Sequence, residues 1–150
     1  VGGLDRDPPT LARIRALVDA RGLSDRVCFA GEAEGAALEA HYQAADVFVL
    51  ATWHEGYGMV VAEALAHGLP VISTRTGGIP DLVEPEGRAP AGLLVAPGDE
   101  TSLRGALARI IEDPDLRHRL RSGALEARAS LRSWDQAADH MGLALEQVIG

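Results

Sequence analysis

Two glutamates separated by seven residues stand out in the segment WHEGYGMVVAEALAHG, residues 53–68. Glu55 precedes a turn that contains Gly56 and Gly58, and Glu63 lies inside the apolar run that follows. Glycines permit a sharp turn and let a ligand approach the main chain closely. The free N–H groups of a first helical turn carry about half a positive charge and can bind a phosphate or diphosphate. The segment therefore predicts an anion site built from backbone.

Glu63 lies about five residues inside this predicted helix, roughly 7.5 Å from its start at a rise of about 1.5 Å per residue. A ribose attached to a diphosphate at the helix start would reach that depth, and a carboxylate can accept hydrogen bonds from two neighbouring ribose hydroxyls. Glu55 lies on the other side of the expected anion and could receive hydroxyls from the group on the far phosphate. The pair therefore predicts a carboxylate on each side of the bound anion.

Each glutamate also has a purely structural interpretation. Glu55 could be an exposed loop carboxylate near a positive helix end, which stabilises by a few tenths of a kcal/mol to about 1 kcal/mol. Glu63 lies at i+4 from Met59 and i+3 from Val60, which predicts a buried, apolar side of the helix. An unpaired carboxylate there would be costly, so pairing with an arginine such as Arg75 is the alternative to a ligand.

Apolar patterning predicts which elements position these residues. Helical spacing predicts helices over 11–22, 35–45 and 58–67, and a short helix after the turn in TGGIPDLV. Continuous apolar runs predict buried strands within 26–31, 46–52, 69–74 and 91–99. Strands hidden on both faces and alternating with helices predict a parallel sheet covered by helices, an α/β Rossmann-like domain of three layers.

The remaining residues predict a C-terminal helical stretch, with helices over 100–113, 114–130 and 133–149. Ligands of such sheets bind outside the carboxyl ends of the strands. That rule selects the turn at Gly2 and Gly3, the loop after Gly31, and the loops 52–58 and 74–79. Cys28, the only cysteine, lies in a predicted strand and is expected to be a small buried apolar residue.

Composition restricts the function classes. The chain has 150 residues, 47% of them hydrophobic and 24% charged, which is typical of one globular domain. The net charge is −8 and all 14 basic residues are arginines spread along the chain, which argues against nucleic-acid binding. The sequence contains no run of 18 apolar residues, signal peptide or lipidation motif, so we expect a soluble, cytoplasmic protein.

Taken together, these segments resemble the C-terminal domain of retaining glycosyltransferases of family 4, also called group 1, which have the GT-B fold. The resemblance covers nearly the whole chain and includes GLSDRVCFAGE, LEAHYQAADVFVLATWHEGYGMVVAEALAHGLPVISTRTGGIPDLV, GLLVAPGD and SWDQAA. Two glutamates at this spacing carry little information alone. Within ADVFVL, EGYGMVVAEALAHGLPVI and TGGIPDLV they are highly specific.

The resemblance implies a role for each residue of the donor site. Glu55 would be catalytic, facing the donor sugar and helping to hold it during transfer. The backbone of Gly56 to Val60 would cradle the diphosphate and sugar, and Glu63 would bind the ribose hydroxyls. Glu32 and Ala33 resemble the loop that binds the base. The expected substrate-binding residues are Glu55, Gly56, Tyr57, Gly58, Met59, Val60 and Glu63.

The full-length enzyme would be a hexosyltransferase that moves a sugar from a UDP or GDP sugar to an acceptor hydroxyl with retention of configuration. Family members generally need no metal or other cofactor, and the sequence has no Asp-x-Asp motif or His cluster with metal-ligand spacing. Residues 1–150 would be the donor-binding domain without its first strand–helix unit, whose Arg and Lys clamp the diphosphate. We expect this fragment alone to be inactive.

The acceptor would be a sugar, a lipid or a small molecule bound by an N-terminal domain outside this chain, and the full-length enzyme could associate peripherally with a membrane. The sequence leaves the base, the donor sugar and the acceptor open. Two alternatives also remain: a sugar-nucleotide epimerase or phosphorylase-like enzyme of the same fold, and a non-catalytic interaction module that keeps the fold.

Overall fold

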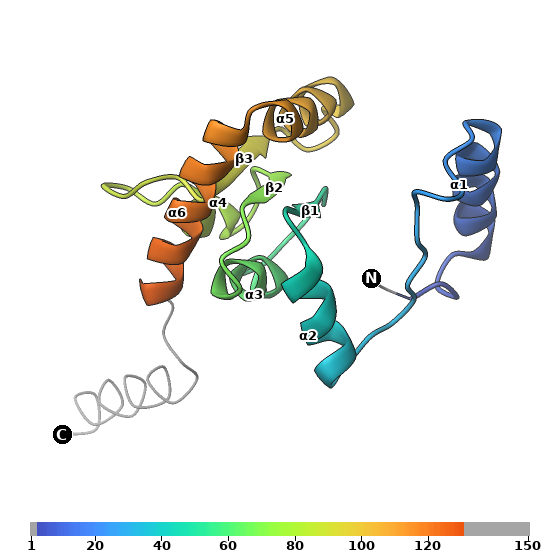
Figure 1. Ribbon diagram of the computed structural model, residues 1–150, viewed down its shortest axis with the longest axis horizontal. Helices are drawn as coiled ribbons and strands as arrows, with labels where there is room; N and C mark the ends of the chain where they lie inside the picture. Colours follow the sequence, from blue (N-terminus) through green and yellow to red (C-terminus); the bar gives the residue numbers. More distant parts are fainter. Residues whose placement is uncertain (1–2, 131–150) are drawn as a thin grey trace. The chain divides into compact units, whose positions relative to one another are not determined.

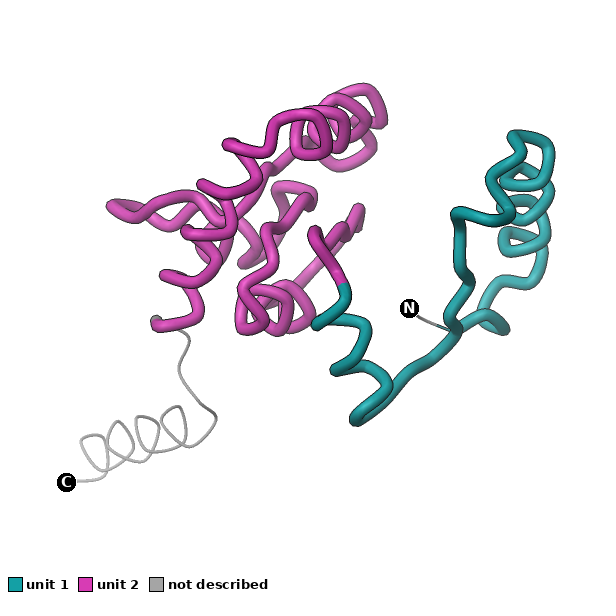
Figure 2. The backbone as a smooth tube through the Cα atoms, in the orientation of Figure 1, with its two compact units in different colours: residues 1–44 teal, residues 45–150 magenta. Residues whose placement is uncertain are grey.

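The computed structural model describes residues 3–130, and the predicted helix over 133–149 lies outside them. The chain divides into two compact units, residues 1–44 and 45–150 (Figure 2). Residues 46–74, which include the glutamate pair and the strands before and after it, all lie in the second unit.

The first unit contains two helices, α1 (Pro8–Ala20) and α2 (Gly35–Ala44), close to the ranges predicted from the sequence. The side chain of Asp7 caps α1 by accepting a hydrogen bond from the Thr10 N–H at 3.0 Å. The guanidinium of Arg15 lies 5.3 Å from the centroid of the Phe29 ring, a cation–π contact that ties α1 to the segment after it.

The predicted strand over 26–31 is wrong, because these residues have no regular secondary structure. A β-strand exists through hydrogen bonds to a neighbouring strand, and the described residues of this unit contain no other strand that could pair with it. Cys28 is exposed, so the prediction of a buried cysteine is also wrong. The apolar run therefore lacks the partner that its pattern requires.

The second unit is built on a parallel sheet in the order β1 (Phe48–Leu50), β2 (Val71–Thr74), β3 (Gly92–Val95) (Figure 1). All three strands run in the same direction, with Leu50 opposite Ser73 and Thr74 opposite Val95 at their carboxyl ends. The prediction of a parallel sheet is confirmed, although each strand is shorter than its apolar run.

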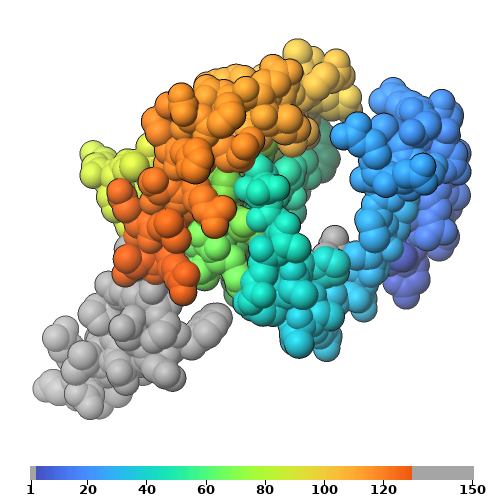
Figure 3. Space-filling view, viewed as in Figure 1, coloured from blue at the N-terminus to red at the C-terminus, as the bar shows by residue number. Residues whose placement is uncertain are grey.

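Helices cover both faces of this sheet, as a Rossmann-like fold requires (Figure 1). The helices are α3 (Met59–Ala66), α4 (Ile79–Val83), α5 (Glu100–Glu112) and α6 (Pro114–Ser130). Figure 3 shows α5 and α6 lying side by side, in agreement with their contacts. Within residues 3–130, none of the helices combines the length and the apolar character needed to cross a lipid bilayer.

The core on the α5 side of the sheet is centred on Ile72, which is fully buried. Ile110 of α5 and Leu120 of α6 join it in one apolar cluster. Neighbouring residues of β2 point to opposite faces, so Val71 faces the other side. On that side α4 packs against the sheet, because a Cβ built on Gly92 of β3 would be 2.8 Å from the side chain of Val83 in α4.

Two adjacent isoleucines of α5 provide a matched test of this core. Ile110 is fully buried, whereas Ile111 is 66% exposed. We expect Ile110→Ala to lower the free energy of unfolding by about 2–5 kcal/mol, because it leaves a cavity. Ile111→Ala removes the same atoms from the surface and should change that free energy by at most about 0.5 kcal/mol. Urea denaturation of both variants measures the difference, and equal losses would contradict this description of the core.

Candidate functional site

Two buried hydroxyls of β2 hold the chain as it leaves β1. The Ser73 hydroxyl donates to the Leu50 carbonyl at 2.7 Å. The Thr74 hydroxyl donates to the Thr52 carbonyl at 2.6 Å and accepts from the Thr52 N–H at 3.3 Å. The Thr52 hydroxyl in turn donates to the His54 carbonyl at 2.9 Å. These bonds continue the pairing of β1 with β2 beyond the last residue of β1 and fix the start of the loop that carries Glu55.

The backbone around Glu55 then packs directly against the loop that precedes α4. The Gly78 N–H donates to the Gly56 carbonyl at 2.7 Å. Gly77 has φ +53°, and a Cβ there would overlap the carbonyl oxygens of Glu55 and Gly56. A Cβ on Gly78 would lie 3.0 Å from the carbonyl oxygen of Tyr57. Because only a loop without side chains can approach this closely, the two glycines determine where Glu55 lies.

α3 begins at Met59, directly after this loop. Gly58 occupies the N-cap position with φ 85° and makes no side-chain cap hydrogen bond. The first bond within the helix runs from the Ala62 N–H to the Gly58 carbonyl at 2.9 Å. The N–H groups of Met59, Val60 and Val61 therefore have no acceptor inside the helix, as at any helix start. The glycine spacing predicts a backbone anion site at these N–H groups, and the binding of an anion there stays a prediction.

Glu63 lies on the exposed side of α3, so the prediction that this side is buried is wrong. The helical spacing correctly groups it with Met59 and Val60, but these side chains are 54% and 40% exposed. α3 is apolar on every side except at Glu63, and the pattern cannot say which face meets the sheet; the buried residues are Val61, Ala64 and Leu65. An exposed carboxylate avoids the desolvation penalty that a buried one would incur.

Arg75, the alternative partner considered for Glu63, instead pairs with Glu84. Its Nη2 atom lies 2.6 Å from Glu84 Oε2. Both side chains are partly exposed to solvent, so the pair contributes little to stability. Glu63 therefore does not depend on Arg75.

Glu55 is half-buried in its loop, and Gly56 and Tyr57 after it are exposed, Tyr57 to 64%. The predicted substrate-binding residues thus form one continuous segment from Glu55 to Val60, with Glu63 one turn further along the exposed side of α3. Their roles toward a ligand stay predictions. Among residues 3–130, no three His, Cys, Asp or Glu side chains gather in a way that could hold a metal ion.

Two of the other predicted loops lie in the first unit and adjoin each other there. A Cβ on Gly3 would be 2.9 Å from the Oε1 atom of Glu32. The turn at Gly3 and the loop after Gly31 therefore meet within that unit. The role of Glu32 and Ala33 in base binding stays a prediction.

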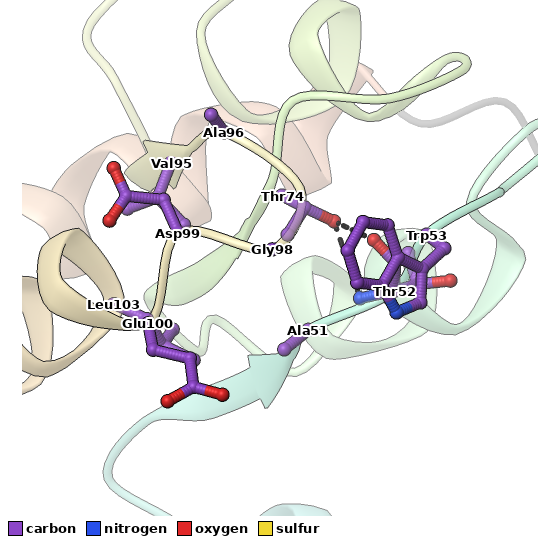
Figure 4. Close-up of a pocket in the computed structure, with 10 residues that line it drawn as sticks. All are labelled: Ala51, Thr52, Trp53, Thr74, Val95, Ala96, Gly98, Asp99, Glu100 and Leu103. Atoms are coloured by element: carbon purple, nitrogen blue, oxygen red, sulfur yellow. Dashed lines mark hydrogen bonds between the residues drawn. The ribbon is translucent and has the colours of Figure 1, made fainter.

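Sequence reasoning missed a pocket at the same carboxyl edge of the second unit (Figure 4). Its volume is about 260 Å³. We call it the Trp53 pocket; its lining residues are Ala51, Thr52, Trp53, Thr74, Val95, Ala96, Gly98, Asp99, Glu100 and Leu103. The segment GLLVAPGD could have indicated it, because Gly98 and Asp99 follow β3 just as Thr52 and Trp53 follow β1.

Hydrogen bonds at the start of α5 keep Asp99, one of the residues that line this pocket, in its charged form. Asp99 caps α5 through its Oδ1 atom, which accepts from the Ser102 N–H at 2.9 Å, and its Oδ2 atom accepts from the Ser102 hydroxyl at 2.7 Å. The Ser102 N–H, and then its hydroxyl, lower the pKa of Asp99 below its ordinary value. Asp99 is therefore a carboxylate at neutral pH.

Comparison with known proteins agrees with this architecture. The model of the family described as "Glycosyl transferases group 1" matches residues 1–127. A curated relative, the D-inositol 3-phosphate glycosyltransferase of Corynebacterium jeikeium, is 33% identical over 138 residues, which are 92% of this chain and 32% of the relative. The chain thus spans about a third of that relative's length.

Two solved structures have similar folds. Sucrose-phosphate synthase from Thermosynechococcus elongatus is 36% identical with a TM-score of 0.77, covering 93% of this chain and 34% of that one. Anabaena HepE, in complex with UDP, is 25% identical with a TM-score of 0.81, covering 97% of this chain and 40% of that one. The prediction of a Rossmann-like α/β half of a GT-B enzyme is confirmed by these likenesses.

The close approach at Gly77 can be tested with a matched glycine. Gly77→Ala should lower the free energy of unfolding by about 2 kcal/mol or more, because an alanine there has a left-handed backbone and meets the carbonyl groups of Glu55 and Gly56. Gly105 lies within α5, and a Cβ built on it would have no neighbour within 4 Å among residues 3–130 apart from the backbone of its own helix. Gly105→Ala should therefore raise the free energy of unfolding by about 0.5–1 kcal/mol. Chemical denaturation measures both. A Gly77 variant as stable as the parent protein would show that the contact does not constrain the loop.

Proposed function

The chain belongs to the group 1 glycosyl transferases, and on that basis we propose that residues 1–150 are the nucleotide-sugar-binding domain of a larger enzyme. The enzyme transfers a sugar from a nucleoside-diphosphate sugar to an acceptor hydroxyl. The observation that carries the proposal is the continuous segment from Glu55 to Glu63, where a loop held by main-chain contacts, a helix start and an exposed glutamate follow one another at one edge of the sheet.

The start of α3 is the proposed site of the diphosphate. Its first N–H groups point away from the helix and carry about half a positive charge. Charge that develops on the diphosphate as the sugar leaves would be stabilised by donors already in place, so no reorganisation is needed during the reaction. We propose that these N–H groups, with an Arg and a Lys from outside this chain, stabilise the negative charge of the diphosphate, as a metal ion does in other enzymes. The reaction then needs no metal cofactor.

Glu63 is the proposed partner of the ribose. It lies four residues after Met59, which places it about 6 Å along the helix from the diphosphate position. Its side chain is exposed to solvent on that side of α3. A carboxylate at this depth accepts hydrogen bonds from two vicinal hydroxyls, which phosphate groups do not offer.

Glu55 is the proposed catalytic residue on the sugar side of the diphosphate. Its backbone lies against Gly77 and Gly78, so the point from which the half-buried side chain extends is defined before any ligand binds. A preorganised carboxylate can hold sugar hydroxyls so that the anomeric carbon faces its acceptor. We propose that transfer retains the anomeric configuration and that the base is that of UDP or GDP. The UDP complex of the Anabaena relative supports testing UDP first.

The complete enzyme, in this proposal, is a cytoplasmic hexosyltransferase whose acceptor domain lies outside the chain. Its acceptor is a sugar, a lipid or a small molecule, and it can associate peripherally with a membrane. Residues 1–150 alone should bind nucleotide weakly and show no turnover, because half of the cleft would come from the other domain.

Replacement of Glu63 tests the ribose contact. In the complete protein, Glu63→Ala should weaken the binding of UDP or GDP by about 10- to 100-fold, since hydrogen bonds to a charged group are lost. Glu112→Ala also removes one exposed carboxylate from a helix, at the far end of α5, and should leave the affinity unchanged. Isothermal titration calorimetry measures all three proteins. Equal affinities for the two variants would rule out the ribose role.

Replacement of Glu55 separates chemistry from nucleotide binding. Glu55→Gln keeps the size of the side chain but removes its charge, so the donor sugar is held less well and transfer from a panel of nucleotide sugars should fall by about 100-fold. The affinity for UDP or GDP should stay close to that of the parent protein, because the diphosphate and ribose contacts remain. Release of nucleoside diphosphate, followed with a coupled assay, measures the loss. If the parent protein itself releases none from any donor, a non-catalytic module is the better interpretation.

A further inference from the structure

The loop that carries Glu55 is backed by residues 75–84, which we call the support segment. A turn of two glycines in this segment meets the main chain of the loop, where the Gly78 N–H donates to the Gly56 carbonyl at 2.7 Å. The other glycine, Gly77, has φ +53°. Because glycine populates many backbone conformations, two glycines do not hold the shape of a turn by themselves. The residues on either side of the turn must therefore keep it against the loop.

α4 forms most of the support segment and is anchored in the core. Two of its residues, Ile79 and Val83, are fully buried. α4 also packs against the start of α3, because a Cβ built on Gly58 would be 3.3 Å from the side chains of Ile79 and Leu82. Apolar burial thus holds α4 in place, whereas the glycine turn before it is partly exposed and has no side chain of its own to bury.

An ion pair joins the two ends of the support segment across this turn. The Arg75 Nη2 atom donates to Glu84 Oε2 at 2.6 Å, and the two side chains are 53% and 32% exposed. Arg75 lies two residues before Gly77, and its N–H donates to the Val95 carbonyl of β3 at 2.8 Å. Glu84 is the C-cap of α4. The pair therefore links the start of the turn to the end of the buried helix and limits how far the turn can move.

From this arrangement we propose that Arg75 and Glu84 are positioning residues of the transfer site, which hold the glycine turn against the loop of Glu55. An exposed ion pair contributes little to the free energy of unfolding of the whole protein. A small displacement of a positioned group can nevertheless slow a reaction without weakening the fold. The effect of the pair on transfer rests on the proposed function, whereas its effect on the turn does not.

Hydrogen exchange in the complete protein, measured by mass spectrometry on peptides from residues 75–84, tests the effect on the turn without any activity assay. Arg75→Met and Glu84→Gln should each speed exchange in these peptides about two- to fivefold, the range that one exposed ion pair supplies. The double variant Arg75→Glu/Glu84→Arg restores opposite charges and should return exchange close to the rate of the parent protein. Glu86→Gln removes an exposed carboxylate that is not bonded to Arg75, and should have no effect. Higher ionic strength should bring the parent protein toward the single variants, because salt screens exposed charges.

Transfer kinetics test the positioning role. Both single variants should lower kcat about two- to fivefold, and the charge-swapped double variant should recover most of that loss. The affinity for UDP or GDP should change by less than about twofold, because the proposed diphosphate and ribose contacts are on α3, which α4 supports without the ion pair. A loss of kcat or of nucleotide affinity in Arg75→Met that Glu84→Gln does not share would mean that Arg75 contacts a ligand directly. That result would overturn the proposal.

Three further outcomes decide against one part of the proposal or all of it. Exchange that stays at the parent rate in both single variants, or that stays fast in the double variant, shows that the ion pair does not hold the turn. Exchange that changes as expected while kcat stays constant excludes the positioning role. A parent protein that transfers no sugar from any donor removes the proposed function and the positioning role together, and the exchange rates alone then decide whether the pair holds the turn.

Discussion

Main-chain contact between two loops is the constraint on which the candidate site depends. The carbonyl groups of Glu55 and Gly56 lie against Gly77 and Gly78 so closely that no side chain fits between them. One hydrogen bond, from the Gly78 N–H to the Gly56 carbonyl at 2.7 Å, fixes the register of the two loops. The contact positions both the backbone of Glu55 and the start of α3, because Gly58, the N-cap of the helix, follows only two residues after Gly56.

β2 organises both faces and the edge of the sheet. Ile72 anchors the cluster with α5 and α6, and Val71 is buried on the opposite side. The next two residues, Ser73 and Thr74, are equally buried, but their hydroxyls hydrogen-bond to the chain that leaves β1. The same four-residue strand therefore supplies core packing at one end and loop positioning at the other. That division explains how hydrogen bonds hold the main chain of an edge loop whose side chains are largely exposed.

The sequence predicts an element well when its signal lies within one segment. It predicts an element poorly when that element needs a neighbour elsewhere in the chain. The parallel sheet and the α3 start were predictable, since apolar runs around helices and the Gly56 and Gly58 pair are local signals. The run at 26–31 did not form a strand, because a strand needs a neighbour that a local pattern cannot supply. Glu63 was assigned to the wrong side because α3 is apolar nearly all round. The Trp53 pocket was missed because it joins segments that lie about 45 residues apart.

Two places at the carboxyl edge of the sheet, the start of α3 and the Trp53 pocket, differ in how well they suit an anionic ligand. With a net charge of −8 and no lysine, the surface offers no broad attraction for an anion, so an anionic ligand must be held by local donors. The start of α3 offers such donors in its backbone. The Trp53 pocket, by contrast, is lined by the acidic residues Asp99 and Glu100 and by no basic residue. A diphosphate is therefore better placed at the N–H groups of α3 than beside Asp99 and Glu100, where like charge would repel it.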